Sequence, residues 1–292
     1  MLDILFGILQ EGIIFSVMAL GVYIALNILD FPDLTADGSF PLGMAITTVC
    51  LIAGINPFLC LLLSFLAGAL AGAVTGVLNV KLKITSLLSG IITMTALYSI
   101  NYSIVGKPNE FLQVGVNTIY SIIPKSLGAF AYSNRYLIIT FILAVLVKLI
   151  LDLYLRTKSG FLLRSTGDNP QLVVTLGKNP GTTKILGLAI GNGLIALSGS
   201  MNMQYIKSFN VSAGTGTLVM GLAAVILGTT MFKKVKFFNA TTSVIIGMII
   251  YKACISLAML LGLESQHTNL IISLLFVVTL ILSKGGIKKC LS

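Results

Sequence analysis

The sequence predicts an all-α, polytopic helical membrane protein, and three observations carry this fold class. Hydrophobic residues make up 56% of the 292 positions and charged residues only 10%, whereas about a quarter of the residues in a soluble domain are charged. The apolar residues form runs of roughly 18–25 positions, the length that a helix needs to cross a bilayer. Within the runs, polar and apolar residues do not alternate as in membrane strands. A soluble enzyme is therefore excluded.

Apolar segments bounded by charged or turn residues follow one another along the whole chain. We expect eight or nine membrane segments, including short or broken ones, near residues 4–29, 40–54, 57–80, 84–105, 136–155, 185–206, 215–232, 237–262 and 268–283.

The second segment is too short for a straight span. Residues 30–39 carry three acids and no base, and only about fifteen apolar residues follow, fewer than a span needs. The same order of long helix, polar break and short segment recurs at 185–206, 208–217 and 218–232. Matching interruptions of this kind are typical of transporters built from inverted repeats, whose substrate path lies beside the breaks.

We interpret the chain as one transmembrane domain that contains two inverted repeats. The first repeat covers about 4–105 and the second about 185–283. An external loop at 106–134 and a cytoplasmic loop at about 156–184 lie between them. Gly68, Gly72 and Gly76 recur at every fourth position, a spacing that lets membrane helices approach closely.

The net charge of +10 indicates an orientation in the membrane. With the turn at 81–83 in the cytoplasm, thirteen Lys and Arg residues lie inside and four outside, in agreement with the positive-inside rule. We therefore expect the amino terminus outside and the carboxyl terminus in the cytoplasm. No aromatic-interleaved basic stripe is present, so no nucleic-acid partner is predicted.

Metal and nucleotide sites are not predicted in this chain. The four cysteines are widely spaced, and the single histidine, His267, lies in a polar turn, so no metal-ligand spacing occurs. No G-x-x-x-x-G-K-[ST] motif occurs either, so the chain lacks the loop that cradles nucleotide phosphates.

The cytoplasmic loop contains a short predicted helix, Pro170–Leu176. Asn169 suits the N-cap, Pro170 the first helical position, and Gly177 the left-handed residue after the end. This helix exposes apolar side chains: Leu172, Val173 and Val174. We interpret it as a plug for a groove of another protein; the alternative is a helix that lies on the lipid headgroups.

Three segments in order resemble permease subunits of ABC importers of the branched-chain amino-acid and ribose type. They are "FPDLTADGSFPLGMA", "GFLLRSTGDNPQLVVTLGKNP" and, at 221–228, "GLAAVILG". The chain departs from the family pattern after the last motif, where Thr229, Thr230 and a lysine-rich turn replace further glycines. Within the family, the chain looks most like the branch of tryptophan-type and uncharacterised amino-acid permeases.

The resemblance implies a subunit that is not itself an enzyme, in the cell membrane of a prokaryote. It would translocate a small solute, with an aromatic or branched-chain amino acid favoured, delivered by an extracellular binding protein. A second permease copy or a paralogue would complete the pore, and ATP with Mg would bind a separate cytoplasmic ABC ATPase. The residues implied to couple to that ATPase are Gly160, Arg164, Gly167, Asp168, Asn169, Pro170, Leu172, Val173 and Gly177. Arg164 would contact the ATPase or a lipid phosphate, and Asp168 would favour the start of the short helix.

Polar residues near the two breaks are candidates for the substrate path. Asp33, Asp37 and Ser39 would line the path or cap the short second segment, and we favour capping. A second set lies on the long helix of the second half and would hydrogen-bond a ligand or a neighbouring helix: Asn192, Asn202 and Gln204.

Two lysines lie inside apolar runs. Lys252 has no acid nearby in the sequence, so it is either functional, as intramembrane charges often are, or extended toward the membrane surface. Lys148 precedes Asp152 by four residues, which predicts a local ion pair.

Two other functions are alternatives to an ABC importer permease: a secondary transporter and a membrane enzyme. An ion-coupled secondary transporter also uses inverted repeats, but it is expected to carry paired acids inside the membrane, and no acid lies in the middle of a predicted span. A membrane enzyme would need a catalytic set, which one loop histidine does not supply.

Overall fold

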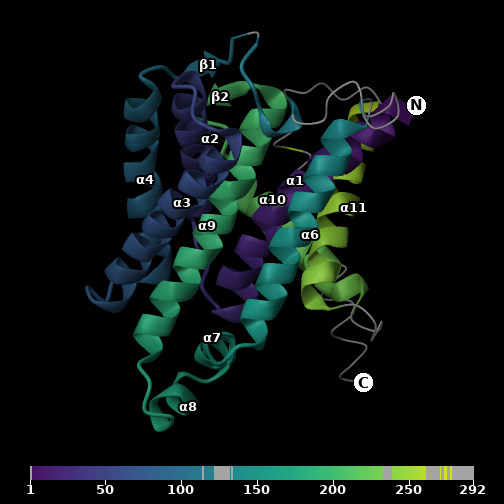
Figure 1. Cartoon of the computed structure of the whole chain (residues 1–292). Coiled ribbons are helices and arrows are strands. Elements are labelled where there is room, and N and C mark those ends of the chain that lie inside the picture. Colours follow the sequence, from purple (N-terminus) through teal and green to yellow (C-terminus); the bar gives the residue numbers. More distant parts are fainter. Residues whose placement is uncertain are drawn as a thin grey trace.

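The computed structural model is a helical bundle (Figure 1) and describes residues 2–113, 115–121, 132, 134–232, 239–260, 270, 273, 274 and 277, with side chains from residue 5 onward. In this part of the chain, six helices are long and apolar enough to cross a membrane, and two apolar helices are shorter. The all-α, polytopic class is confirmed. The predicted segment at 268–283 lies almost wholly outside the described residues.

The long helices agree with the predicted runs. They are α1 (Leu2–Tyr23), α3 (Pro57–Val80), α4 (Ser86–Val105), α6 (Arg135–Arg156), α9 (Pro180–Ile206) and α11 (Ala240–Leu260). α9 begins five residues earlier than predicted, because Asn179 caps it and Pro180 takes the first helical position. Its Oδ1 accepts a 2.8 Å hydrogen bond from the Gly181 amide.

The two short helices are α2 (Ala36–Ile52) and α10 (Thr217–Met231), which confirms the predicted short segments after each break. α2 lies parallel to α9, since Ser39 and Thr47 bond to Asn192 and Ser200. α10 runs the opposite way, and its Gly228 meets the backbone of α11 at Ser243. The two short helices therefore start at the middle of the bundle and run toward opposite ends.

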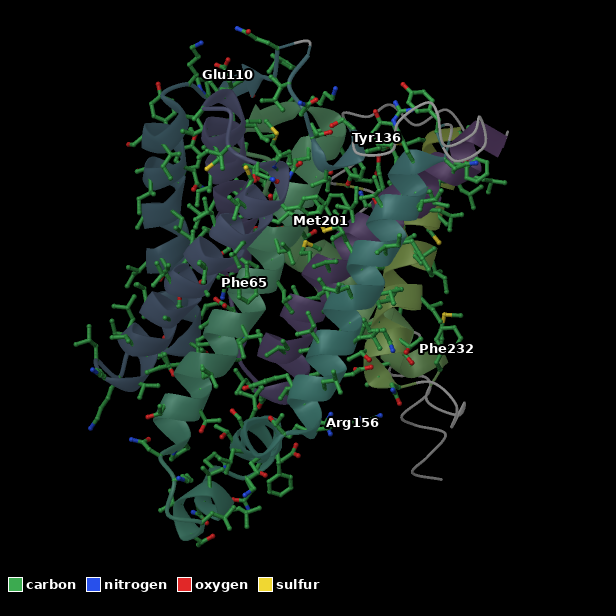
Figure 2. All side chains as sticks on the ribbon, viewed as in Figure 1. Phe65, Glu110, Tyr136, Arg156, Met201 and Phe232 are labelled. Atoms are coloured by element: carbon green, nitrogen blue, oxygen red, sulfur yellow. The ribbon has the colours of Figure 1, made fainter. Side chains whose placement is uncertain are left out.

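One end of the bundle, the strand end, carries two short strands. β1 (Asn109–Phe111) pairs antiparallel with β2 (Ser208–Asn210), and the 3₁₀ turn η2 (Ile119–Ser121) lies beside them. Glu110 marks this end in Figure 2. Neither strand is predicted from the sequence, because three-residue strands show no period of their own.

The opposite end, the helix-pair end, carries α7 (Lys158–Asp168) and α8 (Pro170–Thr175). The described basic residues gather at this end: Lys81, Lys83, Arg156, Lys158, Arg164, Lys178 and Lys184. Lys107, Arg135 and Lys207 lie at the strand end, and the other two described basic residues, Lys148 and Lys252, lie inside helices α6 and α11.

Close contact between α3 and α9 holds the centre of the bundle. A Cβ added at Gly72 would overlap the backbone carbonyl of Leu188, and one at Gly68 would overlap that of Asn192. Gly76 meets the backbone of Ile185 in the same way. The predicted role of the Gly68, Gly72 and Gly76 spacing in tight packing is therefore confirmed.

We predict that Gly72→Ala lowers the free energy of unfolding by about 1–3 kcal/mol, because the added methyl group forces α3 away from α9. Gly7→Ala is the matched control, since nothing lies within 4 Å of a Cβ at Gly7, and there alanine only improves helix propensity. Thermal unfolding of both variants in detergent measures the difference. Equal midpoints for the two variants would contradict the packing role.

Candidate functional site

Both helix breaks meet at the middle of α9. The α1 helix ends in a π-helical turn, η1 (Ile24–Ile28), and residues 29–35 then run without regular helix to the start of α2. The second break, residues 211–216, ends at the start of α10. Pi-helical turns are common at functional positions, so this convergence is one candidate site.

Asp33, Ser39 and Asn192 form a closed hydrogen-bond cluster at this point. Asp33 Oδ2 accepts from Asn192 Nδ2 at 2.6 Å, and Asn192 Oδ1 accepts from Ser39 Oγ at 2.7 Å. Asp33 Oδ1 accepts from the Thr35 amide at 2.9 Å, and all three side chains are buried. Asp33 therefore fixes the turn that leads into α2, and the cluster satisfies its own polar groups. The N-cap of α2 is Thr35 and has no side-chain cap bond, so the favoured capping role is not observed for Asp33 or Ser39.

Asp37 caps a helix other than the predicted one. It lies in the first turn of α2, but its Oδ1 accepts from the Leu218 amide at 2.8 Å and from Thr217 Oγ1 at 3.0 Å. Its Oδ2 accepts from the Gly216 amide at 3.3 Å. These donors begin α10, whose own N-cap is Gly216, so the expectation that Asp37 caps α2 is wrong. A side chain of α2 supplies the cap because the amides at the start of a buried helix need acceptors.

The other predicted path residues lie apart from this cluster. Gln204 connects η2 to α3: its Oε1 accepts from the Ile119 amide at 2.9 Å, and its Nε2 donates to the Pro57 carbonyl at 3.3 Å. Asn202 is buried on α9, ten residues beyond Asn192. Of the two roles considered for these amides, contact with neighbouring segments is therefore the observed one for Gln204.

Lys252 forms an ion pair with an acid that lies far from it in the sequence. Its Nζ lies 3.2 Å from Glu11 Oε2 and 3.8 Å from the centre of the Phe15 ring, both on α1. No acid lies near Lys252 in the sequence, and helix packing supplies Glu11 from 241 positions away. The predicted local pair of Lys148 and Asp152 is confirmed at 3.0 Å.

The loop between α6 and α9 forms two helices, and α7 was not predicted. Thr157 caps α7 by accepting from the Gly160 amide. Gly160 passes against the backbone of Tyr154 and Leu155, and Gly167 against the Ile28 carbonyl, at places where a Cβ would overlap these atoms. α7 is therefore seated on the ends of α6 and α1 through its glycines. The cap at Thr157 followed by the apolar stretch 161–163 is the sequence signal that would have found it.

The predicted short helix is present as α8. Asn169 Oδ1 accepts from the Gln171 and Leu172 amides at 3.1 and 3.3 Å, Pro170 is the first helical residue, and Gly177 has a φ of +69°. These three predicted roles are confirmed. Asp168 is exposed as the last residue of α7, and the cap of α8 comes from Asn169 alone.

Apolar side chains cover the outer face of α8. Leu172, Val174 and Leu176 are 44%, 59% and 52% exposed, whereas Val173 is fully buried. The expectation that Val173 is exposed is therefore wrong: it fixes α8 to the bundle while its neighbours face outward.

A polar cavity of about 490 Å³ lies beside α7, between α1, α6 and α11. Its lining includes Arg156, Arg164, Tyr23 and Asp152, and Figure 2 shows Arg156 at the helix-pair end. Among the described residues neither arginine forms a salt bridge. The contact of Arg164 with an ATPase or a lipid phosphate stays a prediction.

Comparison with known proteins assigns the chain to a family. The family model of the branched-chain amino acid transport system permease component matches residues 4–280. The chain belongs to this family. The sequence resemblance is thereby confirmed for nearly the whole permease.

Relatives of the permease include transport proteins with similar lengths. The tyrosine transport system permease protein of Clostridioides difficile (strain R20291) is 44% identical, over 94% of this chain and 89% of the relative. The probable branched-chain amino acid transport permease protein LivH of Methanocaldococcus jannaschii is 26% identical, over 76% and 73%. The structure titled PsaBC from Streptococcus pneumoniae in complex with Fab has a TM-score of 0.54 at 14% identity, over 94% of the permease and 89% of that chain. This last likeness shows the fold alone.

We predict that Asp37→Ala lowers the free energy of unfolding of the permease by about 0.5–2 kcal/mol, the usual value of a helix cap. Asp37→Asn should keep the stability close to that of the parent, because asparagine caps as well as aspartate does. Unfolding in detergent, followed by circular dichroism, compares the two variants. An equal loss in both would show that charge, rather than the cap, stabilises α10.

Proposed function

We propose that this permease is the membrane subunit of an ATP-driven ABC importer for an amino acid, with an aromatic amino acid such as tyrosine favoured. The tyrosine transport system permease protein, 44% identical over 94% of the chain, supports this substrate class. A second copy or a paralogue completes the pore. Substrate arrives from an extracellular binding protein, and ATP with Mg is bound and hydrolysed by a separate ABC ATPase.

The helix-pair end faces the cytoplasm in this proposal, and the amino terminus lies outside. Support comes from the described basic residues outside the spans: seven lie at the helix-pair end and three at the strand end, with Lys148 and Lys252 inside spans. Basic residues concentrate on the cytoplasmic side. The strand end, with β1 and β2, is then the docking face for the binding protein.

The apolar outer face of α8 is the observation that carries the ATPase assignment. A capped six-residue helix with Leu172 and Val174 exposed, followed directly by an exposed Leu176, presents apolar side chains that suit a groove on another protein. Val173 and the Asn169 cap hold the plug rigid. Because α7 rests on Ile28 through Gly167, movement of the plug is transmitted to the break before α2, where access to the substrate path is switched.

The inverted repeats are part of the same proposal. α2 and α10 start together at the middle of α9 and run toward opposite ends of the bundle. This is the arrangement that two repeats of opposite topology produce, and transporters of this construction bind their substrates near the breaks.

We predict that the double change Leu172→Asp and Val174→Asp reduces co-purification with the ATPase at least tenfold, because two carboxylates cannot enter an apolar groove without a large desolvation cost. The control is Phe111→Asp at the strand end, where a 72% exposed side chain is changed in the same way. Unchanged association of the double variant would rule out α8 as the contact.

The rival function, an ion-coupled secondary transporter, makes a different prediction for uptake. We expect proteoliposomes that hold the permease, its ATPase and its binding protein to accumulate labelled tyrosine. Uptake should require ATP on the side of the membrane where the ATPase lies. Collapse of sodium and proton gradients with ionophores should leave the initial rate unchanged. Uptake by the permease alone, driven by an ion gradient, would support the rival.

A further inference from the structure

A separate cavity of about 350 Å³ lies between α2, α4 and the loop before α10. It differs from the cluster at Asp33, whose polar groups are all paired with one another. Its polar lining residues are Asp37, Thr95, Tyr98, Ser99, Asn101, Ser212 and Thr215. Figure 1 shows α2 and α4 side by side toward the strand end, so the cavity lies between the middle of the bundle and that end.

Asp37 brings a negative charge to this cavity. The side chain is half-buried, and among the described residues no Lys or Arg forms a salt bridge with it. Its Oδ2 accepts only one long bond, 3.3 Å from the Gly216 amide, although a carboxylate oxygen has two lone pairs. A carboxylate at this depth in a membrane protein typically faces a substrate or ion pathway.

Asn101 adds a second acceptor that lacks a donor. Its side chain is fully buried, and its Nδ2 donates to the Gly38 carbonyl at 3.1 Å. Among the described residues, its Oδ1 is the one buried side-chain atom without a hydrogen bond. A buried acceptor left in this state costs free energy, which a donor from a ligand in the cavity would recover.

The rest of the lining suits the other parts of a small zwitterion. Hydroxyl groups of Ser99, Ser212 and Thr215 can donate to a carboxylate, since each carries one donor. Tyr98 is 53% exposed and, together with the apolar Met94 and Val211, offers a surface for an apolar or aromatic side chain. The acceptors lie on α2 and α4, whereas Ser212 and Thr215 lie on the loop before α10.

We propose that this cavity is a substrate-binding station in the permease, where Asp37 and Asn101 bind the ammonium group of an amino acid. The inference rests on the proposed import of amino acids and adds the residues that contact the substrate. The station uses Asp37, one of the predicted path residues, and adds Asn101; it does not include the predicted residues of α9, which are Asn192, Asn202 and Gln204.

Transport by the complete importer in proteoliposomes gives the first test. Asp37→Asn keeps the cap of α10 and removes the charge, so we expect tyrosine uptake to fall at least tenfold while unfolding and ATPase co-purification stay unchanged. Asn101→Leu should lower uptake at least fivefold. The control is Asn79→Leu, an amide of α3 that bonds the Ile84 carbonyl outside the cavity lining and should transport normally. Uptake by Asp37→Asn equal to that of the parent would overturn the proposal.

Thiol labelling gives a second test that does not depend on which substrate is carried. In a variant without native cysteines, we compare the ratio of labelling rates with a cationic and an anionic methanethiosulfonate, because a thiolate favours the cation at any position. The ratio at Ser99→Cys should be at least threefold higher than at the control Phe111→Cys, a 72% exposed position at the strand end, and Asp37→Asn should abolish this difference. Equal ratios at Ser99→Cys and Phe111→Cys would overturn the proposal.

The two tests separate failure of the station from failure of the proposed function. A charge preference at Ser99→Cys without uptake of any amino acid would refute amino-acid import and retain a cation-selective cavity. Normal uptake together with no charge preference would retain the function and refute the station. Tyrosine should also slow the labelling of Ser99→Cys, whereas its analogue without the amino group should not.

Discussion

Three helices meet α9 through glycines, and the rest of the bundle depends on this contact. Gly21 of α1, Gly43 of α2 and Gly72 of α3 each leave room for a carbonyl group of α9. In lipid no hydrophobic effect drives apolar helices together, so close van der Waals contact of this kind supplies the association energy. The same proximity allows short side chains such as Ser39 and Thr47 to reach α9 and hydrogen-bond to it.

Because the breaks are buried, each one needs acceptors for its free amides. Asp33 supplies one acceptor within its own break, and Asp37 supplies those of the other break from across the interface. The two halves of the chain are thereby held together by a carboxylate of the first half and the helix start of the second. The free energy of each short helix thus depends on the position of the other.

The long helices could be predicted from the sequence, because a run of apolar residues of membrane-spanning length indicates a helix buried in lipid. The caps at Asn169 and Asn179 were also within reach, since cap, proline and following glycine lie within a few positions of each other. Asp37 was not: its acidic side chain marks a helix start, but nothing in the order of residues shows that the helix it caps begins 180 positions later. Likewise, Glu11 as the partner of Lys252 follows only from the packing of α1 against α11.

The close contact of α7 with the π-helical turn, made through a glycine, has a mechanical consequence. Gly167 packs directly against the carbonyl group of Ile28, the last residue of the π-helical turn. Side-chain contacts can absorb a small displacement by changing rotamer, but a backbone pressed on a backbone has no such compliance. A tilt of α7 therefore presses on the last residue of that turn, so one backbone contact links the helix-pair end mechanically to the break at residues 29–35.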